Sequence, residues 1–386
     1  MNLLLVGAGG HAFSWKQNVD RHPDWKIVAI VDTDTEKLDH VNSWGVSEDE
    51  AYPTIDDAMK WTDYELDAAL ITSPIPTHHL LATEALENGL HVILEKNMAC
   101  TIKQGQELVR LARTYPELCT VMGTQYRHRP TWWTLKNLFQ SQSSPIGDVS
   151  HFRMKSSANS GSVRRGWRAF MSHIYPSDMM VHHIDSLRYA LDMDVVQVQA
   201  KVFKPSWSRW LGTSTVYMNM VMAPQGKEND KDTWVYGQYL GDWQSTGLKN
   251  DWEDQIEFFC KRGSIRFEPP ENKVKKGAWM DMWEEINGVK LIGEPLGSKL
   301  YSYLDQEDGK TVHKKEVEKR IDIENNPASY LDQVYILDEL ASCIRSKGKI
   351  QPQTNFEDAF KSYLVTRAAI LSSDTGKTIW LPDYYI

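Results

Sequence analysis

The chain has few cysteines and lacks both a long apolar run and an excess of positive charge. Its four cysteines lie far apart and form no CxxC pair; they are Cys100, Cys119, Cys260 and Cys343. Neither a disulfide framework nor a zinc knuckle is therefore expected, and a cytoplasmic, reducing location fits best. No run approaches the roughly 18 apolar residues of a membrane span. The N-terminal run Met1–Gly7 lacks the basic residues of a signal peptide.

Charge and composition narrow the class of protein further. The formal net charge of −9 disfavours binding to nucleic acid or to anionic membranes, because an acidic surface repels phosphate. The 386 residues are 41% hydrophobic and 25% charged, a globular composition with room for two domains. Fifteen tryptophans are present, ten of them from Trp132 to Trp283. They suit core and oligomer-interface packing, or flat platforms for sugar faces, and both roles can hold.

Residues 1–125 alternate between short apolar runs and amphipathic stretches. Strands are predicted at Leu3–Val6, Lys26–Val31, Ala68–Thr72, His91–Leu94 and Thr120–Gly123, and helices at Phe13–Arg21, His78–Glu87 and Ile102–Thr114. This alternation predicts an α/β domain with a doubly wound parallel sheet of the Rossmann type. Such sheets bind ligands beyond the carboxyl ends of their strands.

Residues 126–386 have a different sequence pattern, in which β-type runs are separated by polar turns. Strands are predicted at Val149–Lys155, Val195–Phe203, Thr215–Val221, Thr233–Leu240 and Ile256–Phe267, interrupted by one helix near Ser177–Leu191. The pattern predicts an α+β domain with a large, mostly antiparallel sheet that binds substrate and forms oligomers. Helices follow at 328–376, with a capping-box pattern at Thr354–Glu357, and these helices can pack back on the first domain.

A glycine-rich turn follows the first predicted strand and opens a helix. It reads Gly7, Ala8, Gly9, Gly10, His11 and Ala12, which is a GxGxxA pattern in the context that the motif needs. Gly7 permits the tight turn, Gly9 lets a pyrophosphate approach the backbone, and Ala12 allows close packing of helix on strand. The pattern predicts a dinucleotide site.

Asp32 ends the second predicted strand, about twenty residues beyond the turn. A carboxylate there accepts hydrogen bonds from the ribose 2′-hydroxyl and disfavours a 2′-phosphate. Since no arginine follows in Thr33–Lys37, NAD is predicted in preference to NADP.

Several further motifs occur in one order along the chain. They are Thr72-Ser73-Pro74-Ile75-Pro76-Thr77-His78, Glu95-Lys96, Gly123-Thr124-Gln125-Tyr126-Arg127, Asp178-x-x-x-His182-x-x-Asp185 and the tail Ser373–Lys377. Together with the glycine turn they resemble the Gfo/Idh/MocA oxidoreductases, the family of glucose–fructose oxidoreductase and inositol dehydrogenase. Two positions depart from that family, because Asn97 replaces its usual proline and Met180 its usual glycine.

The resemblance implies a site on both domains. It places Thr72, Ser73, Pro74, His78, Glu95, Lys96 and Gln125 beside the cofactor, and Lys96, Asp178 and His182 in catalysis. Asp178, His182 and Asp185 would share one helix face, and His182 has the pKa range of a general base near neutrality. Lys96 can stabilise the alkoxide or share the proton. Asp185 can instead pair with Arg188.

Substrate contacts are predicted less directly. The candidates are Tyr126, Arg164, Trp167, Arg168, His183 and Tyr236. An arginine near Trp167 can hold a carboxylate, a phosphate or sugar hydroxyls. Adjacent histidines point about 100° apart on a helix, so no metal site is predicted at His182 and His183.

Three functions fit these residues. The first is an NAD-dependent dehydrogenase that oxidises a secondary alcohol of a sugar, sugar derivative or cyclitol. The second retains NAD, oxidises a glycoside transiently and eliminates its aglycone. The third is a non-enzymatic NAD-binding regulator. A tryptophan-rich open sheet face would favour a homodimer or homotetramer.

Overall fold

The computed structural model describes residues 1–39, 41–141, 144, 146–158, 160, 166–245, 255–261, 263–268, 299–304, 319–320 and 332–386. The chain forms two compact units. Unit 1 comprises Met1–Tyr126, Tyr330–Leu364 and Tyr384–Ile386, and unit 2 comprises Arg127–Ser329 and Val365–Asp383. Unit 1 is therefore built from separate stretches of chain, with most of unit 2 inserted between them.

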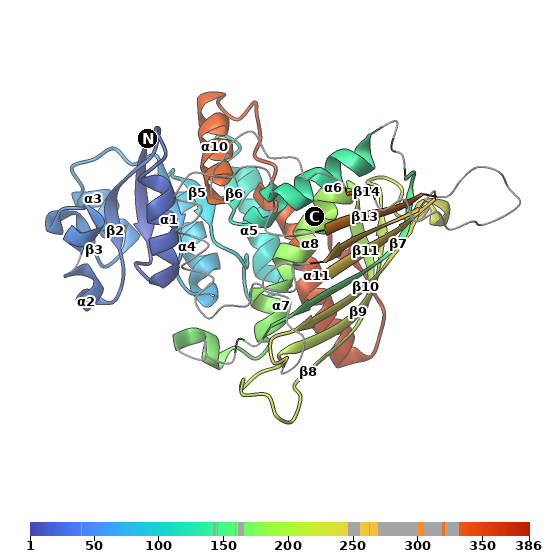
Figure 1. The fold of residues 1–386 in the computed structure, drawn as a ribbon. Coiled ribbons are helices and arrows are strands. Elements are labelled where there is room, and N and C mark those ends of the chain that lie inside the picture. The colour runs from blue at the N-terminus through green and yellow to red at the C-terminus, as the bar shows by residue number, and fades with distance from the viewer. Residues whose placement is uncertain are drawn as a thin grey trace, which may run out of the picture. The chain divides into compact units, whose positions relative to one another are not determined.

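Unit 1 contains a six-stranded parallel sheet in the order β3-β2-β1-β4-β5-β6 (Figure 1). The strands are β1 (Asn2–Val6), β2 (Lys26–Val31), β3 (Ala51–Tyr52), β4 (Ala68–Ile71), β5 (His91–Leu94) and β6 (Thr120–Met122). The predicted Rossmann-type domain is confirmed. The two-residue strand β3 was not predicted, because it is too short to show a periodicity.

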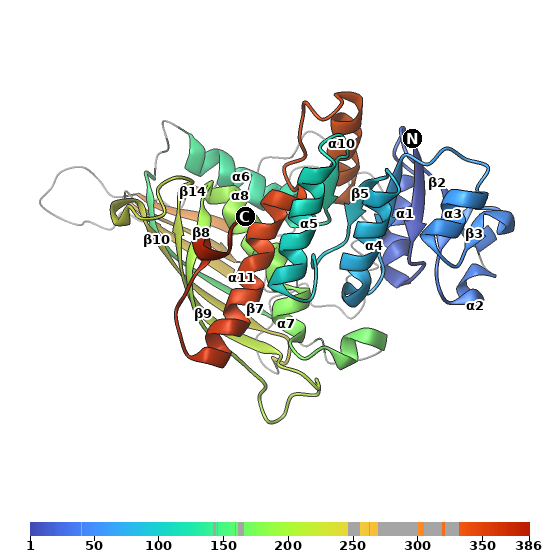
Figure 2. The same ribbon diagram turned by 180° about the vertical axis from the view of Figure 1, so that it is seen from behind.

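Helices cover both faces of this sheet. They are α1 (Gly10–Val19), α2 (Thr35–Leu38), α3 (Ile55–Trp61), α4 (Ile75–Glu87), α5 (Ile102–Thr114) and α10 (Asp332–Arg345). The helices α3, α4 and α5 lie in succession on the face toward the viewer in Figure 2, whereas α1 contacts α10 on the other face. The predicted packing of C-terminal helix on the first domain thus holds for α10.

The core of unit 1 joins α10 to the sheet. Trp15 of α1 is fully buried in a cluster that includes Leu5 and Leu340. The indole of Trp25 donates to the carbonyl oxygen of Leu337 at 3.0 Å. Because a buried indole N–H needs a partner, this bond also orients α10.

Unit 1 also contains a disulfide between Cys119 and Cys343. The expectation of no disulfide, drawn from cysteine spacing, is therefore wrong for this pair. Sequence separation says nothing about distance in the fold, and the two cysteines are 224 residues apart in sequence. Cys100 and Cys260 do not take part in a disulfide.

Unit 2 is built on a sheet with the strand order β14-β13-β12-β11-β7-β10-β9-β8-β15. The strands are β7 (Val149–Ser157), β8 (Asp194–Phe203), β9 (Thr215–Ala223), β10 (Val235–Asp242), β11 (Gln255–Cys260), β12 (Gly263–Glu268), β13 (Lys299–Leu304), β14 (Lys319–Arg320) and β15 (Ile379–Trp380). The strands β7 and β10 pair in parallel, and the other described pairs are antiparallel. The predicted mostly antiparallel sheet is confirmed, although the run Ile256–Phe267 forms a hairpin, β11 and β12, rather than one strand.

Two helices replace the single one predicted near Ser177–Leu191. They are α7 (Ile174–Asp178) and α8 (Met180–Leu191), with Met179 between them. Every residue of α8 is buried. A helix that is buried all round needs apolar or paired polar side chains on each face. Met180, which departs from the family's glycine, is the first residue of α8 and is fully buried.

Among the described residues, the remaining α-helices are α6 (Pro130–Gln140) and α11 (Phe356–Thr375). The cap of α11 is Asn355, whose side chain accepts from the Asp358 amide at 3.0 Å, rather than Thr354 of the predicted capping box. As predicted, α11 ends at Gly376, which adopts a φ of 69°.

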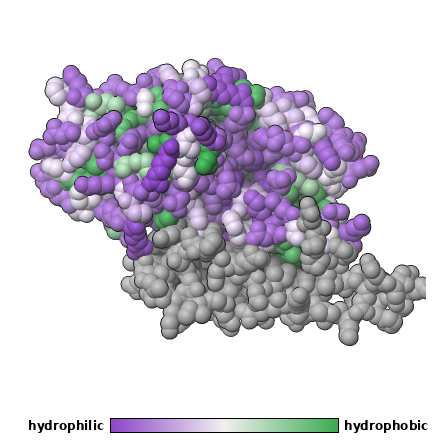
Figure 3. All heavy atoms as spheres, turned by 90° about the horizontal axis from the view of Figure 1, so that it is seen from above, coloured by the Kyte–Doolittle hydropathy of each residue, from purple (hydrophilic) through white to green (hydrophobic). Residues whose placement is uncertain are grey.

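The hydropathy of the helices and of the surface can be compared with that of membrane-spanning segments. In the part of the chain that the structure describes, no helix is long and apolar enough to cross a membrane. On the face drawn in Figure 3, hydrophobic side chains are scattered among hydrophilic ones.

Candidate cofactor and substrate sites

The turn after β1 requires glycine at its first position. Gly7 has a φ of +96°, and its N–H donates to the Val31 carbonyl oxygen at 2.7 Å. A Cβ at Gly7 would lie 2.8 Å from the Ser73 nitrogen. Thr72 holds the same turn, because its hydroxyl donates to the Gly7 carbonyl oxygen at 2.6 Å. An alanine at position 7 would therefore clash with backbone that cannot move independently.

The next glycines face open space. A Cβ at Gly9 or Gly10 would meet no protein atom within 4 Å, so packing against the described protein does not demand glycine there. Gly9 is the N-cap of α1 and makes no side-chain cap. Ala12, one turn on, is fully buried. Bare backbone at a helix N-terminus fits the approach of a pyrophosphate, as the motif predicts.

Asp32 lies at the centre of a small network beside this turn. Its Oδ2 accepts from the Ala8 amide at 2.8 Å, and its Oδ1 accepts from the Asp34 amide at 2.9 Å. Lys37 Nζ lies 3.0 Å and 3.2 Å from the two carboxylate oxygens. The absence of arginine from Thr33–Lys37 did not predict this pairing, because Lys37 supplies the cation instead. The network holds the carboxylate where a ribose is expected and places a cation beside it.

Glu95, predicted beside the cofactor, is engaged by the protein itself. Its Oε1 accepts from the Trp15 indole at 2.7 Å and lies 2.8 Å from His11 Nε2, while its Oε2 accepts from the Lys96 amide at 3.0 Å. Burial tends to raise the pKa of Glu95, but His11, Lys96 and Trp15 outweigh it and hold that pKa below its usual range. The glutamate thus ties the start of α1 to the end of β5.

His78 bridges two loops at the same edge of the sheet. It is buried, and its ring nitrogens lie 2.7 Å from the Asn97 carbonyl oxygen and 2.8 Å from that of Ser73. Burial lowers the pKa of His78. The Lys96–Asn97 peptide, where the family has proline, is cis. His78 therefore links the loop after β4 to the loop after β5. Pro74, also predicted beside the cofactor, is the N-cap residue of α4.

Two side chains at the end of β6 remain unsatisfied. Among the described residues, neither the buried Thr124 Oγ1 nor the buried Gln125 Oε1 has a hydrogen-bond partner. Buried polar atoms in native proteins usually have partners, so orphaned ones at a sheet's carboxyl edge fit a ligand that supplies them. Gln125 was predicted here from the family pattern, whereas Thr124 was missed.

In unit 2, Asp178 is paired with Arg168. Arg168 Nε donates to Asp178 Oδ2 at 2.8 Å, and the guanidinium lies 4.6 Å from the centre of the Trp167 ring. Asp178 is nearly fully buried and Arg168 is partly exposed. The structure thus joins a predicted catalytic carboxylate to two predicted substrate residues. Arg164, also predicted, lies outside the described residues.

The adjacent histidines of α8 have different surroundings. His183 is fully buried, and its Nδ1 lies 2.6 Å from the Tyr239 hydroxyl, which lies 2.7 Å from that of Tyr175. Burial and the nearby Arg129 lower the pKa of His183 to about 3. Its contacts therefore lie with the sheet rather than with a substrate. His182 is also buried.

Other predicted contacts are placed differently from expectation. The alternating burial of β10 puts Tyr236, 53% exposed, on the sheet face opposite Tyr239, which contacts α7. Tyr236 is therefore removed from the proposed substrate contacts. Asp185 pairs with Arg127 through two bonds of 2.7 and 2.6 Å, and Arg188 donates to Asp194 at 2.9 Å. Tyr126 is buried in unit 1.

In the described part of the chain, no group of three His, Cys, Asp or Glu residues is arranged to hold a metal ion.

Known proteins share parts of this architecture. Residues 1–122 match the family model described as "Oxidoreductase family, NAD-binding Rossmann fold" of the Gfo/Idh/MocA group. An uncharacterised oxidoreductase of Bacillus subtilis is 28% identical over 201 residues, 51% of this chain and 55% of that protein. The aligned region thus spans about half of that relative. An inositol 2-dehydrogenase of Serratia proteamaculans is 24% identical over 288 residues, covering 71% of this chain and 80% of that protein.

A solved structure is similar over the whole chain. It is an oxidoreductase from Agrobacterium radiobacter in complex with NAD+, L-tartaric acid and magnesium. The TM-score is 0.74 at 16% identity, with 99% of each chain covered, which shows a shared fold. Over residues 1–122, this chain is therefore similar to the NAD-binding Rossmann domain of the Gfo/Idh/MocA oxidoreductases.

Proposed function

We propose that the protein is an NAD-dependent oxidoreductase that transfers a hydride between nicotinamide and a secondary alcohol of a sugar, sugar derivative or cyclitol. The observation that carries the proposal is the glycine turn, where bare backbone at Gly9 and Gly10 adjoins the anchored carboxylate of Asp32. The named inositol dehydrogenase relative supports the substrate class.

Each side chain has a distinct part in this chemistry. Bound NAD supplies the hydride acceptor. Gly9 and Gly10 would admit the pyrophosphate, Asp32 would hold the ribose, and Thr124 and Gln125 would bind nearer the nicotinamide. Lys96 Nζ would hydrogen-bond the substrate hydroxyl and stabilise the alkoxide, and His182 would accept its proton. Asp178, which accepts a hydrogen bond from Arg168, would orient the substrate.

The first test combines absorbance with product analysis. Purified protein, excess NAD and a panel of sugars, cyclitols, sugar acids and glycosides are followed at 340 nm and by mass spectrometry. Rising absorbance with one compound class supports the dehydrogenase. A cleaved glycoside without NADH would instead favour the NAD-retaining reaction. NAD binding with neither product would contradict the proposal and favour the regulator.

The ion pair of Asp32 and Lys37 gives a prediction about cofactor choice. Replacing Asp32 with serine removes a negative charge from the ribose site and releases Lys37 to pair with a 2′-phosphate. We expect Asp32→Ser to weaken NAD binding about tenfold and strengthen NADP binding about tenfold, a change near 2.7 kcal/mol in their ratio.

Calorimetric titration with both cofactors measures this change. The matched control is Asp32→Ser/Lys37→Ala, which should bind NAD weakly and lose the gain for NADP. An unchanged ratio of the two dissociation constants in Asp32→Ser would show that Asp32 does not select the cofactor.

We further propose a homo-oligomer, assembled through the exposed face of the unit 2 sheet. Of the tryptophans expected on that face, Trp210 and Trp243 are buried, whereas Trp252, Trp279 and Trp283 lie outside the described residues. The face instead presents Tyr217 and Tyr236, 54% and 53% exposed. It also carries Glu257 beside Arg266, charges of both signs that two copies can pair about a twofold axis.

Light scattering at micromolar concentration tests the assembly. Tyr217→Glu should shift a dimer or tetramer toward the monomer, because two like charges would meet across the axis. A wild-type chain that is monodisperse and monomeric would refute the assembly. The cytoplasmic location was predicted from the cysteine pattern, and the Cys119–Cys343 disulfide removes that argument for it.

A further inference from the structure

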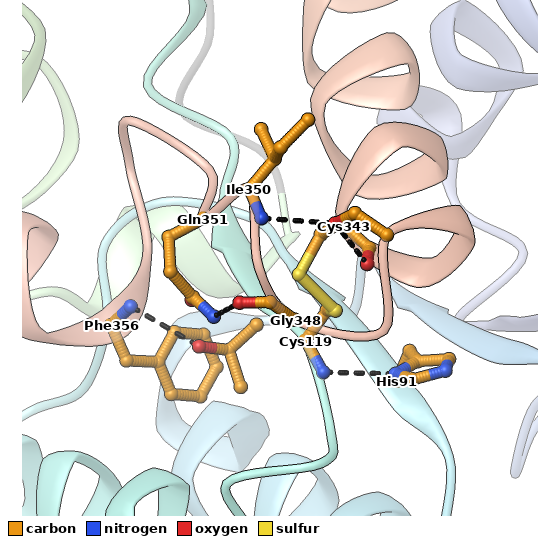
Figure 4. The surroundings of a disulfide bond; sticks show 9 residues. His91, Cys119, Cys343, Gly348, Ile350, Gln351 and Phe356 are labelled. Atoms are coloured by element: carbon orange, nitrogen blue, oxygen red, sulfur yellow. Dashed lines mark hydrogen bonds between the residues drawn. A yellow bond between two sulfur atoms is a disulfide. The ribbon is translucent and has the colours of Figure 1, made fainter.

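The disulfide of unit 1 joins two buried positions on distant stretches of chain. Cys119 immediately precedes β6 and Cys343 lies in α10, with 1% and 0% of their surfaces exposed. Their Cα atoms are 6.2 Å apart, a separation that a disulfide spans without backbone movement. Figure 4 shows the bond and the turn that follows α10.

The residues around the bond form a continuous hydrogen-bonded set. The Cys119 amide donates to His91 Nδ1 at 2.9 Å, while the Cys343 carbonyl oxygen accepts from the Gly348 amide at 2.9 Å (Figure 4). Gln351 donates to the Gly348 carbonyl oxygen at 2.7 Å. Cys343 therefore begins the turn that leads the chain from α10 back toward the sheet.

That returning chain covers the outer edge of β6. In the strand order of unit 1, β6 is the last strand. The Met122 amide donates to the Thr354 carbonyl oxygen at 2.9 Å, and the Thr354 hydroxyl donates back to Met122 at 3.1 Å. The Phe356 amide donates to Thr120 Oγ1 at 3.3 Å (Figure 4). An exposed edge strand has unpaired backbone N–H and C=O groups that can pair with another chain. The segment that covers β6 prevents such pairing.

We propose that Cys119 and Cys343 are oxidised as the protein matures, and that their disulfide is a covalent clasp on the divided Rossmann unit. The clasp closes α10 and residues 346–356 over the β6 edge. Without it, those residues are joined to the first 126 only through unit 2 and by non-covalent packing. This inference does not rest on the proposed enzymatic function.

A small-molecule or protein disulfide can serve as the oxidant, and the electrons and protons of the reaction then balance. The thiolate of one cysteine attacks a small-molecule or protein disulfide, forms a mixed disulfide with it and releases one thiol. The second cysteine then attacks the mixed disulfide and releases the other thiol. Two electrons and two protons pass to the oxidant, which becomes two thiols. A closed loop of 224 residues is among those that a disulfide stabilises most in the chain-entropy model.

The other cysteines provide an internal reference. Cys100 is exposed and Cys260 is partly buried, and neither takes part in a disulfide. Burial raises the pKa of Cys260 to about 12, so its thiol is seldom ionised and reacts poorly. Cys260 therefore does not compete for the clasp in the folded chain.

The first experiment counts thiols. Protein purified without reductant, then incubated with oxidised glutathione, is denatured, alkylated with iodoacetamide and weighed by mass spectrometry. A disulfide that joins Cys119 to Cys343, with Cys100 and Cys260 either alkylated or bound to glutathione, supports the clasp. Four alkylated cysteines would overturn it.

The second experiment measures stability. Cys119→Ala/Cys343→Ala should melt about 5–10 °C below the wild type. A phosphine reductant present during the melt should lower the wild-type Tm by a similar amount and leave the double variant unchanged. The matched control, Cys100→Ala/Cys260→Ala, should keep the wild-type response to reductant. A wild-type Tm insensitive to reductant would overturn the clasp, even if the alanine variant fails to fold.

The third measurement locates the effect. After reduction, hydrogen exchange should rise in peptides that contain Met122 and residues 346–356, and stay unchanged in β1 and β2. A uniform rise over the whole of unit 1 would contradict a clasp on the β6 edge.

Discussion

Replacing Lys96 with methionine is expected to lower kcat by about 10²–10⁴-fold while leaving the Kd for NAD within about threefold. Lys96 follows β5 at the carboxyl edge of the parallel sheet, where ligands of such folds bind. Methionine keeps the apolar stem and removes the ammonium group. The alkoxide would lose its cationic partner, and the loss would fall on the chemical step.

Steady-state kinetics at 340 nm with the identified substrate, beside calorimetric NAD titration, measure this split. The matched control is Lys103→Met, an 83% exposed lysine on α5, which should keep wild-type kinetics. A fully active Lys96→Met would show that the ammonium group does no chemistry.

The pH profile separates Lys96 from His182. If His182 accepts the proton, the acidic limb of kcat/KM should be lost in His182→Asn and kept in Lys96→Met. The opposite pattern would make Lys96 the base.

Unit 2 should lose stability as the pH falls from 7 to 5. Burial and Arg129 lower the pKa of His183 to about 3, and burial, Arg127 and Lys136 lower the pKa of His128 to about 3. Near pH 5 the unfolded chain binds a proton at each histidine, near pKa 6.5, while the folded chain does not. Each histidine should therefore remove about 2 kcal/mol of unfolding free energy between pH 7 and 5.

Urea unfolding at pH 5, 6 and 7 measures this loss. His183→Asn keeps a polar group near Tyr239 but does not titrate, so its stability should depend less steeply on pH. The control is the exposed His151, whose replacement by asparagine should leave the slope unchanged. An equal slope in the wild type and His183→Asn would contradict a neutral buried imidazole. Glu95, whose lowered pKa matters only below its usual range, does not contribute in this window.

The strand periodicities and the glycine turn were readable in the sequence because they depend on neighbours along the chain. Strands β1, β2 and β5 need an apolar run, and the Gly7 turn needs a residue that accepts positive φ. The single predicted helix near Ser177–Leu191 was wrong because a break at Met179 leaves no mark in periodicity when both halves are buried.

The tertiary structure decided which side chains become hydrogen-bond, ion-pair or disulfide partners. Glu95 bonds to Trp15 and His11, Asp178 pairs with Arg168, and Cys119 is bonded to Cys343. Residues far apart along the chain meet only after strands and helices have packed, and sequence spacing carries no measure of that distance. The sequence by itself therefore determined the Rossmann turn, its acidic partner Asp32 and the change from parallel to antiparallel sheet. Only the tertiary structure decided which polar groups are already engaged by the protein, because burial obliges each of them to find a partner in space.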